Sequence, residues 1–301
     1  YSVSYWERFY KNFEISLTIE GEERQFSPFF KKLALKKTCS GGLIVGIQRS
    51  ESYFPELSLG PEIARDVYYT WNDIYRLLHR TEDLPSRIVT AYDAHTKKKV
   101  SGIEPNGSVM PRVRSKVVIA FDNIYGNLGN PLTAESYERF VKFFVKLLGE
   151  VDDATVLMKL KSLRNFSHPV YESVDLKGLI EQGRFSVWQE PRTDILAFQD
   201  RGTLFVGIGI SSAISQLGMR GLNAVNFDVL GLRDYHPLYN APYEDVVFDS
   251  ESDLLAKSCA ILNGRISDLG YWPKPDRQKT DNHKSFASII EQSLTGDHHS
   301  D

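Results

Sequence analysis

Residues 205–228 read FVGIGISSAISQLGMRGLNAVNFD, and this stretch decides the fold class. An apolar run leads into a loop of glycines and serines, a short amphipathic segment, a second apolar run and an aspartate. This order predicts a strand, a helix and another strand in direct succession, which is the repeating unit of a parallel α/β sheet. In such a sheet, the carboxyl end of a strand and the first amides of the next helix form a seat for phosphate oxygens.

The residue types in the loop suit that chemistry. Gly207 and Gly209 allow close backbone approach, while Ser211 and Ser212 can cap a helix and donate hydroxyl groups. The loop is not a GxGxxG fingerprint, because Ser212 stands where the last glycine is needed, and no GK[ST] follows it. NAD and ATP are therefore disfavoured as ligands, and phosphate binding competes with a purely structural role in helix capping and packing.

Strand and helix patterns alternate on both sides of this stretch, so we predict an α/β fold with parallel sheets flanked by helices. Thr133 is the expected N-cap of a long helix, with Glu135 in its first turn. In the second half, we expect strands at 115–122, 154–161, 185–190, 203–209 and 223–228, and helices at 133–151, 174–183, 194–202, 213–221 and 250–264. In the first half, we expect helices at 5–13 and 27–41 and strands at 14–21, 42–50, 66–70 and 86–93, with a helix after 70. Tyr5, Phe9 and Phe13 form the expected apolar stripe of the first helix.

Residues 95–114, HTKKKVSGIEPNGSVMPRVR, interrupt the alternation and are basic, without periodicity and rich in turn residues. They predict a linker, although a long surface loop within one domain would have the same composition. We therefore divide the chain into a partial acceptor-side Rossmann-like domain plus linker at 1–112, a nucleotide-binding Rossmann-like domain at 113–275, and a C-terminal helix and tail at 276–301. The chain opens with YSVSYWERFY, which has neither an initiator Met nor a signal-peptide pattern, so we expect the first domain to be truncated.

Composition excludes several classes of function. The 301 residues carry a formal net charge of -3 and a pI near 6.2, which gives no general attraction to nucleic acid or to an anionic membrane. Cys39 and Cys259 are the two cysteines, too few for a disulfide framework, and they favour a reducing, cytoplasmic setting. No apolar run reaches the roughly 18 to 20 residues of a membrane helix.

A basic segment follows the strand predicted at 154–161. Lys159, Lys161 and Arg164 would place positive charge at the carboxyl edge of the sheet, and His168, held by the rigid Pro169, could contact a nucleotide phosphate there. A solvated basic turn is the alternative interpretation. Two phosphate-compatible loops at neighbouring strand ends support each other.

The order of these motifs resembles the nucleotide-binding domain of GT-B glycosyltransferases. It runs from the FD strand end at 121–122 through a KLK strand end, His-Pro, GISSAI and an NFD strand end to the DVVFDSESDLLAK segment, which we expect to be helical. The resemblance spans roughly residues 113–262 and looks closest to bacterial surface-polysaccharide biosynthesis proteins and to transferases that use CMP-activated sugars such as Kdo or sialic acid. It implies that His168-Pro169 and Ser211-Ser212 hold the CMP. In related sequences His-Pro often follows the strand directly, whereas here SLRNFS intervenes.

Catalysis of glycosyl transfer requires a base or a nucleophile, and carboxylates at strand ends are the candidates. Asp93, with His95 two residues on, is our expected base, because the resemblance implies that acceptors bind the first domain. An ordinary loop aspartate is the competing interpretation. Asp122 and Asp228 are expected to orient loops or to bind a sugar or ribose hydroxyl.

The sequence therefore predicts a metal-independent glycosyltransferase of the GT-B type, without a cofactor, that moves a sugar from a nucleotide-activated donor to a growing polysaccharide or glycolipid. Its expected partners are the donor and a saccharide acceptor, not nucleic acid, and lipid-linked acceptors are compatible with peripheral contact at the inner membrane. A CDP-alcohol phosphotransferase, a sugar-nucleotide epimerase of the same fold and a non-catalytic GT-B remnant stay open as alternatives. The histidines show no metal spacing such as HExxH.

Overall fold

The computed structural model describes residues 3–20, 27–47, 65–70, 87–90, 116–123, 125, 131–188, 203–233, 237–239 and 246–265. The chain divides into two compact units. One unit combines Tyr1–Lys97 with Pro273–Asp301, and the other comprises Lys98–Trp272. Each unit contains a sheet whose strands are all parallel, so both are of the predicted α/β class.

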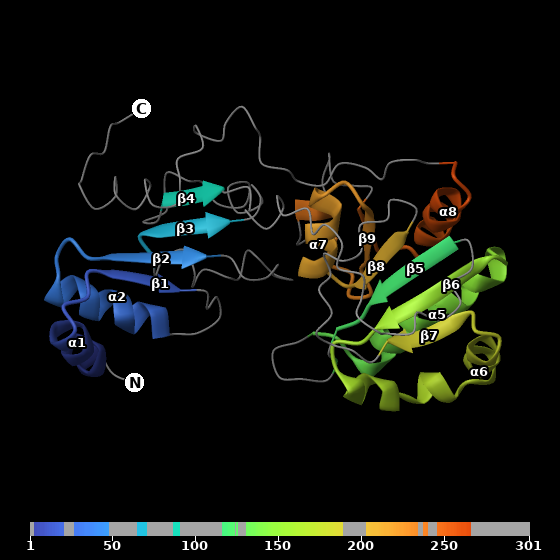
Figure 1. The fold of residues 1–301 in the computed structure, drawn as a ribbon, viewed down its shortest axis with the longest axis horizontal. Coiled ribbons are helices and arrows are strands. Elements are labelled where there is room, and N and C mark those ends of the chain that lie inside the picture. Colours follow the sequence, from blue (N-terminus) through green and yellow to red (C-terminus); the bar gives the residue numbers. More distant parts are fainter. Residues whose placement is uncertain are drawn as a thin grey trace, which may run out of the picture. The chain divides into compact units, whose positions relative to one another are not determined.

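The first unit is a four-stranded sheet in chain order, β1-β2-β3-β4, with two helices on one face (Figure 1). Ile44 points to the helix face and packs with Ala34 and Leu35, whereas Val45 points to the other face and packs with Val67. The elements are α1 Val3–Asn12, β1 Leu17–Glu20, α2 Ser27–Thr38, β2 Leu43–Ile47, β3 Val67–Thr70 and β4 Arg87–Thr90.

The apolar stripe expected on the first helix is wrong in its register. Tyr10 is the buried residue of α1, and Trp6 packs beside it. Tyr5 and Phe13, which the sequence pattern assigned to the core, are 43% and 65% exposed. Aromatic residues occur on several sides of this short helix, so its sequence alone left the direction of burial ambiguous.

The second unit is a six-stranded sheet in the order β10-β9-β8-β5-β6-β7. Read from β7, this is the doubly wound order in which the first strand of the unit lies in the middle and later strands add on either side. The elements are β5 Lys116–Phe121, α5 Ala134–Glu150, β6 Ala154–Lys159, the 3₁₀ turns η4 Leu163–Ser167 and η5 Pro169–Glu172, α6 Val174–Glu181, β7 Phe185–Trp188, β8 Leu204–Ile208, α7 Ser212–Met219, β9 Asn223–Phe227, η7 Pro237–Tyr239, β10 Val247–Phe248 and α8 Glu251–Leu262.

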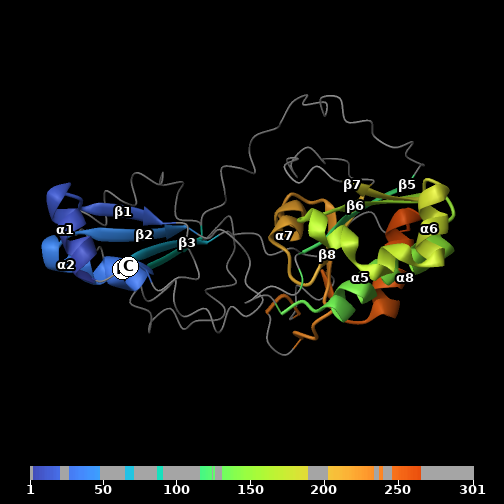
Figure 2. The same ribbon diagram turned by 90° about the horizontal axis from the view of Figure 1, so that it is seen from below.

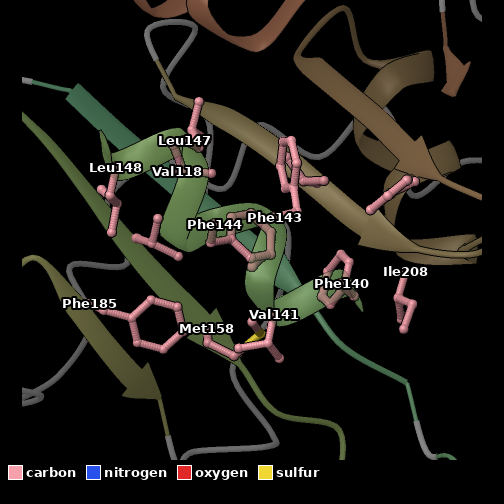
Figure 3. Close-up of a cluster of buried hydrophobic side chains, with 14 of the residues drawn as sticks. Val118, Phe140, Val141, Phe143, Phe144, Leu147, Leu148, Met158, Phe185 and Ile208 are labelled. Carbon is pink, nitrogen blue, oxygen red and sulfur yellow. The ribbon is translucent and has the colours of Figure 1, made fainter. Parts of the chain in front are cut away.

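Helix α5 supplies much of the core on one face of this sheet. It begins as predicted, because Thr133 Oγ1 accepts a hydrogen bond from the Ser136 amide and Ser136 Oγ accepts one from the Thr133 amide. Aromatic and aliphatic side chains of the helix, among them Phe140, Phe144 and Leu147, pack in one buried cluster with strand residues such as Val118 and Met158 (Figure 3). Helix α8 lies beside α5 on this face (Figure 2). Helix α7 packs on β8 and β9 from the opposite face, where the missing side chain of Gly207 leaves room for Ile214.

Two parts of the second unit differ from the sequence-based prediction. Val247 and Phe248 belong to the DVVFDSESDLLAK segment, which the resemblance implied to be helical, but they pair with β9 as the edge strand β10. Helix α8 follows its N-cap Ser250, in agreement with the helix expected at 250–264. Local β-branched and aromatic residues favour this extended pairing over helix. The SLRNFS insertion forms η4 with Ser162 as its cap.

Several predicted segments lie outside the described residues: the linker at 95–114, the helices expected after 70 and at 194–202, and the tail at 276–301. These predictions and the predicted domain limits therefore stay predictions.

Over the described ranges, no helix combines the length and the apolar character that a bilayer crossing would need.

Truncation of Phe144 to Ala tests the core under α5. Phe144 is fully buried and meets Phe140 edge to face at 5.0 Å between ring centroids. We expect the free energy of unfolding to fall by about 3–5 kcal/mol, measured by urea denaturation, because the cavity cannot be refilled. Val174→Ala, at a position that is 86% exposed, should change it by less than about 0.5 kcal/mol. Equal effects of the two substitutions would contradict this core assignment.

Candidate functional site

The carboxyl ends of the parallel strands bring the predicted phosphate-binding residues to one edge of the sheet. β5 pairs with β8 on one side and with β6 on the other. The Gly/Ser loop after β8 and the basic turn after β6 therefore flank the end of β5, about 10 Å apart if neighbouring strands are spaced ordinarily. This is the point at which the strand order reverses, where open α/β sheets generally bind their ligands.

The loop after β8 requires its glycines. A Cβ on Gly207 would come within 2.5 Å of Ile214 Cγ1, so only glycine lets the start of α7 approach the strand this closely. Gly209 has a φ of 63°, which is in the left-handed region, and its amide donates to the carbonyl of Phe227 at 2.7 Å. The loop is thus tied to β9 before the helix begins.

The start of α7 is directed by Asn226 of β9. Asn226 is fully buried, and its Oδ1 accepts the Ser211 amide at 3.1 Å. Its Nδ2 is buried and has no hydrogen-bond partner within the described part of the chain. Ser211 is the N-cap of α7, but its side chain makes no capping hydrogen bond. The amides of the first helical turn therefore donate no hydrogen bond to the Ser211 hydroxyl group. Together with the helix dipole, amides at a helix start favour an anion there.

The three basic residues near the end of β6 differ in their surroundings. Lys159 is 8% exposed, and its Nζ lies 5.8 Å from the centroid of the Phe121 ring. Lys161 is exposed, and its Nζ donates to Asn123 Oδ1 at 2.9 Å. Arg164 is exposed in η4. Positive charge is therefore present at this edge, and the two exposed cations are Lys161 and Arg164, which follow the strand.

His168 is a structural link between two elements. Its Nδ1 accepts the Val170 amide at 3.1 Å and thereby caps η5, so the proton is on Nε2, which donates to the Ala134 carbonyl at 3.1 Å. The ring is buried, and Pro169 beside it is exposed as the first residue of η5. Because the protein's own backbone engages both ring nitrogens, a ligand contact by His168 would require one of these bonds to open.

Asp122, directly after β5, joins three elements. Its Oδ1 accepts the Lys161 amide, and its Oδ2 accepts Asn165 Nδ2 at 2.6 Å and the Tyr137 hydroxyl at 3.4 Å. The Tyr137 hydroxyl also pairs with that of Tyr171 at 2.9 Å. The side chain thus fastens the turn after β6 and the start of α5 to the end of β5.

Burial raises the pKa of Asp122 to about 6, although the Lys161 amide, Asn165 and Tyr137 all act to lower it. Removal from water disfavours the carboxylate more than these donors stabilise it. Burial likewise raises the pKa values of Tyr137 and Tyr171, so both phenols remain protonated donors.

Asp228, directly after β9, is fully buried and holds the following loop. Its carboxylate accepts the amides of Leu230 at 2.9 Å, Gly231 at 3.1 Å and Leu232 at 2.5 Å, as well as the Tyr239 hydroxyl. Both strand-end aspartates therefore orient loops through hydrogen bonds. Binding of a sugar or ribose hydroxyl by either one stays a prediction.

Asp93 and His95 lie outside the described residues, so their role as the base also stays a prediction. Within the described ranges, no group of three His, Cys, Asp or Glu side chains could hold a metal ion. Sequence reasoning missed Asn165 and Asn226, the two buried amides that hold the turn and the loop. No local pattern marks them, since an isolated asparagine in a polar turn or near a strand end is common.

No protein-family model and no curated protein sequence matches the chain. Solved structures do match its fold. The UDP-GlcNAc 2-epimerase of Methanocaldococcus jannaschii, in complex with UDP-GlcNAc and UDP, aligns with a TM-score of 0.58 and 11% identity over 98% of this chain and 79% of that one. The S. aureus MnaA-UDP structure aligns with a TM-score of 0.55 and 11% identity over 91% and 74%. The chain has a GT-B fold.

A glycosyltransfer enzyme also matches, but more weakly. The trehalose 6-phosphate synthase of Burkholderia multivorans aligns with a TM-score of 0.44 and 10% identity over 87% of this chain and 65% of that one. This likeness is too low to carry an argument. At such identities the comparisons establish the architecture and leave the chemistry open.

Substitution of Gly207 by Ala tests the close packing of α7 on β8. The added methyl group must displace Ile214, so we expect a loss of about 1–3 kcal/mol in the free energy of unfolding. Gly178→Ala is the matched control, because it lies within α6 and its added Cβ has no atom within 4 Å. There we expect a gain of roughly 0.5–1 kcal/mol, so the two substitutions should have opposite signs in urea unfolding. A neutral Gly207→Ala would refute the packing argument.

The titration of Asp122 tests the polar network at the end of β5. Its carboxyl ¹³C resonance should titrate near pH 6 rather than near the ordinary value of 3.8. A raised pKa means that the folded protein binds this proton more tightly than the unfolded chain does. The stability of the wild type relative to Asp122→Asn should therefore be greatest below about pH 4 and fall as the pH rises to about 6. A midpoint near 4 would show that the carboxylate is well solvated.

Proposed function

We propose that the chain is a nucleotide-sugar enzyme that holds the phosphate groups of its donor at the carboxyl ends of β5 and β8. The single observation that supports this most is the reversal of strand order beside the Gly207–Ser211 loop, where the side chain of Ser211 makes no capping hydrogen bond to α7. Backbone amides that converge at a helix start bind phosphate oxygens without a metal ion. Lys161 and Arg164 follow β6, which pairs with β5 on the side away from β8. They add positive charge on that side of the β5 end.

The nature of the ligand is supported by the fold comparisons. Two of the structures that match with TM-scores of 0.55 and above, those from S. aureus and M. jannaschii, hold UDP, and the second also holds UDP-GlcNAc. A uridine nucleotide is therefore the first ligand to test, and the CMP-sugar interpretation of Ser211-Ser212 and His168-Pro169 comes second. The exposed cations suit either nucleotide, because they would meet phosphate rather than base.

Epimerisation of a sugar nucleotide is the preferred reaction. The preference is supported by the fold match to the UDP-GlcNAc 2-epimerase, which aligns with a TM-score of 0.58. Glycosyl transfer to a polysaccharide or glycolipid, which the motif order first suggested, is the second candidate. Both reactions need a base, and the described strand-end carboxylates Asp122 and Asp228 are engaged by loop amides. Asp93 and His95 remain the residues proposed for that task.

Thermal unfolding with UDP, CMP, CDP and GDP tests the nucleotide site. A nucleotide present at 100 times its Kd should stabilise the folded state by about 2.7 kcal/mol, which corresponds to roughly 5–10 °C in a domain of this size. We expect UDP to give the largest shift and the shift to persist in EDTA. No shift with any of the four would favour a non-catalytic GT-B remnant and would overturn the proposal.

Product analysis then separates the reactions. Incubation of UDP-GlcNAc without an acceptor should yield an epimerised sugar nucleotide in ¹H NMR spectra. Consumption of donor that depends on an added saccharide would instead identify a transferase, and a new phosphodiester in mass spectra would identify a phosphotransferase. Asp93→Asn should abolish turnover while leaving the UDP-induced thermal shift in place, because its proposed role is in the reaction and not in phosphate binding.

A further inference from the structure

Asn165 is a buried residue in the middle of η4, the turn formed by the SLRNFS insertion. Its side-chain amide donates two hydrogen bonds across to the end of β5, to Asp122 Oδ2 at 2.6 Å and to the Asn123 carbonyl at 2.9 Å. The residue is 1% exposed. A neutral NH₂ group is the donor that these two acceptors require, because it carries two protons and adds no charge.

Two further bonds reinforce this link. The Lys161 amide donates to Asp122 Oδ1, and Lys161 Nζ donates to Asn123 Oδ1 at 2.9 Å. The strand register of β5 and β6 ends at Phe121 and Lys159, so beyond that point these side-chain bonds join the two segments. We call the set of bonds among Asp122, Asn123, Lys161 and Asn165 the strand-end clamp. Asn165 is the member that reaches both acceptors from within η4.

The clamp determines where η4 lies relative to the end of β5. Lys161 directly precedes η4, and Arg164 is within it, next to Asn165. Both cations are exposed, so their positions depend on how the turn is fastened. The clamped residues Asp122 and Asn123 directly follow Phe121, the residue of β5 that pairs with Gly207 at the start of the Gly/Ser loop.

We propose that Asn165 is a positioning residue that holds Lys161 and Arg164 at the distance from the start of α7 that an anionic, diphosphate-containing ligand requires. The identity of that ligand rests on the proposed function, whereas the clamp rests on the contacts alone. Asn165 itself need not touch the ligand. Its loss would release the turn and leave a buried carboxylate with fewer donors.

The clamp also links the turn to the protonation of Asp122. The groups that face Asp122 are Lys161 and Asn165 from the turn, Tyr137 from α5, and Tyr171 from η5 through Tyr137. The His168 ring packs on Tyr137 at 5.4 Å between centroids. Lys161 and the hydrogen bond from Asn165 both lower the pKa of Asp122, which burial raises to about 6. Removal of Asn165 should therefore move the titration of Asp122 to higher pH.

The first measurement needs no ligand. In ¹H-¹⁵N spectra of the full chain, the Lys161 amide resonance reports on the carboxylate that it donates to, and its pH midpoint should lie near 6 in the wild type. In Asn165→Ala we expect this midpoint to rise. Asn263→Ala is the matched control, because Asn263 caps α8 and accepts from Lys116 at the opposite end of β5. It should leave the midpoint unchanged.

The second measurement uses UDP as the probe, titrated by calorimetry at pH 8 and pH 5. We expect Asn165→Ala to weaken UDP binding about tenfold at pH 8, as the loss of one hydrogen bond to a charged group would. Asn165→Asp should weaken it at least as much at pH 8, since two carboxylates would face each other. At pH 5 the pair can share one proton, so UDP affinity relative to the wild type should recover in Asn165→Asp but not in Asn165→Ala.

Each outcome decides a separate point. An unchanged Lys161 midpoint in Asn165→Ala would overturn the clamp, whatever UDP does. A raised midpoint with unchanged UDP affinity, in a wild type that binds UDP, would overturn the positioning role. A wild type that binds no nucleotide would overturn the proposed function and with it the ligand assignment. Misfolding would not explain a recovery of UDP affinity at pH 5 that occurs in Asn165→Asp and not in Asn165→Ala. Both variants alter the same buried position, and they differ in the carboxyl group that can take up a proton.

Discussion

The pairing of β5 between β8 and β6 is the constraint on which the rest of the second unit depends. Since all strands of this sheet are parallel, their carboxyl ends share one edge, and the order reverses at β5. Helices must then cover both faces: α5 and α8 on one, α7 on the other. Because of this reversal, the loop after β8 and the turn after β6 lie on either side of the carboxyl end of β5.

Polar residues at this edge serve mainly to hold the backbone in place. Asp122 and Asp228 accept loop amides, His168 caps a turn, and Asn226 fixes the amide that precedes α7. Buried groups of this kind are costly when unpaired, so each one selects a particular loop conformation. In the site that we propose, the first amides of α7 and the exposed cations of the basic turn would meet the phosphate groups of the ligand. The proposed site is thus formed mostly from oriented backbone, supported by buried side chains.

The GT-B fold by itself does not select the reaction. One fold can host several reactions, which differ in the groups that act on the substrate. In this chain the residues proposed for that chemistry, Asp93 and His95, belong to the first unit. Epimerisation is therefore the reaction that we propose, and glycosyl transfer stays the second candidate.

The sequence by itself determined the α/β class, the parallel strands and the position of α5, because hydrophobic periodicity and the Thr133 cap act over a few neighbouring residues. It also placed the Gly/Ser loop and the basic turn at strand ends. Only the tertiary structure decided that Val247 and Phe248 form an edge strand, that Tyr5 and Phe13 face outward, and that Asn165 reaches Asp122. These outcomes depend on contacts between residues far apart in the chain, and such contacts leave no periodic signal in the local sequence.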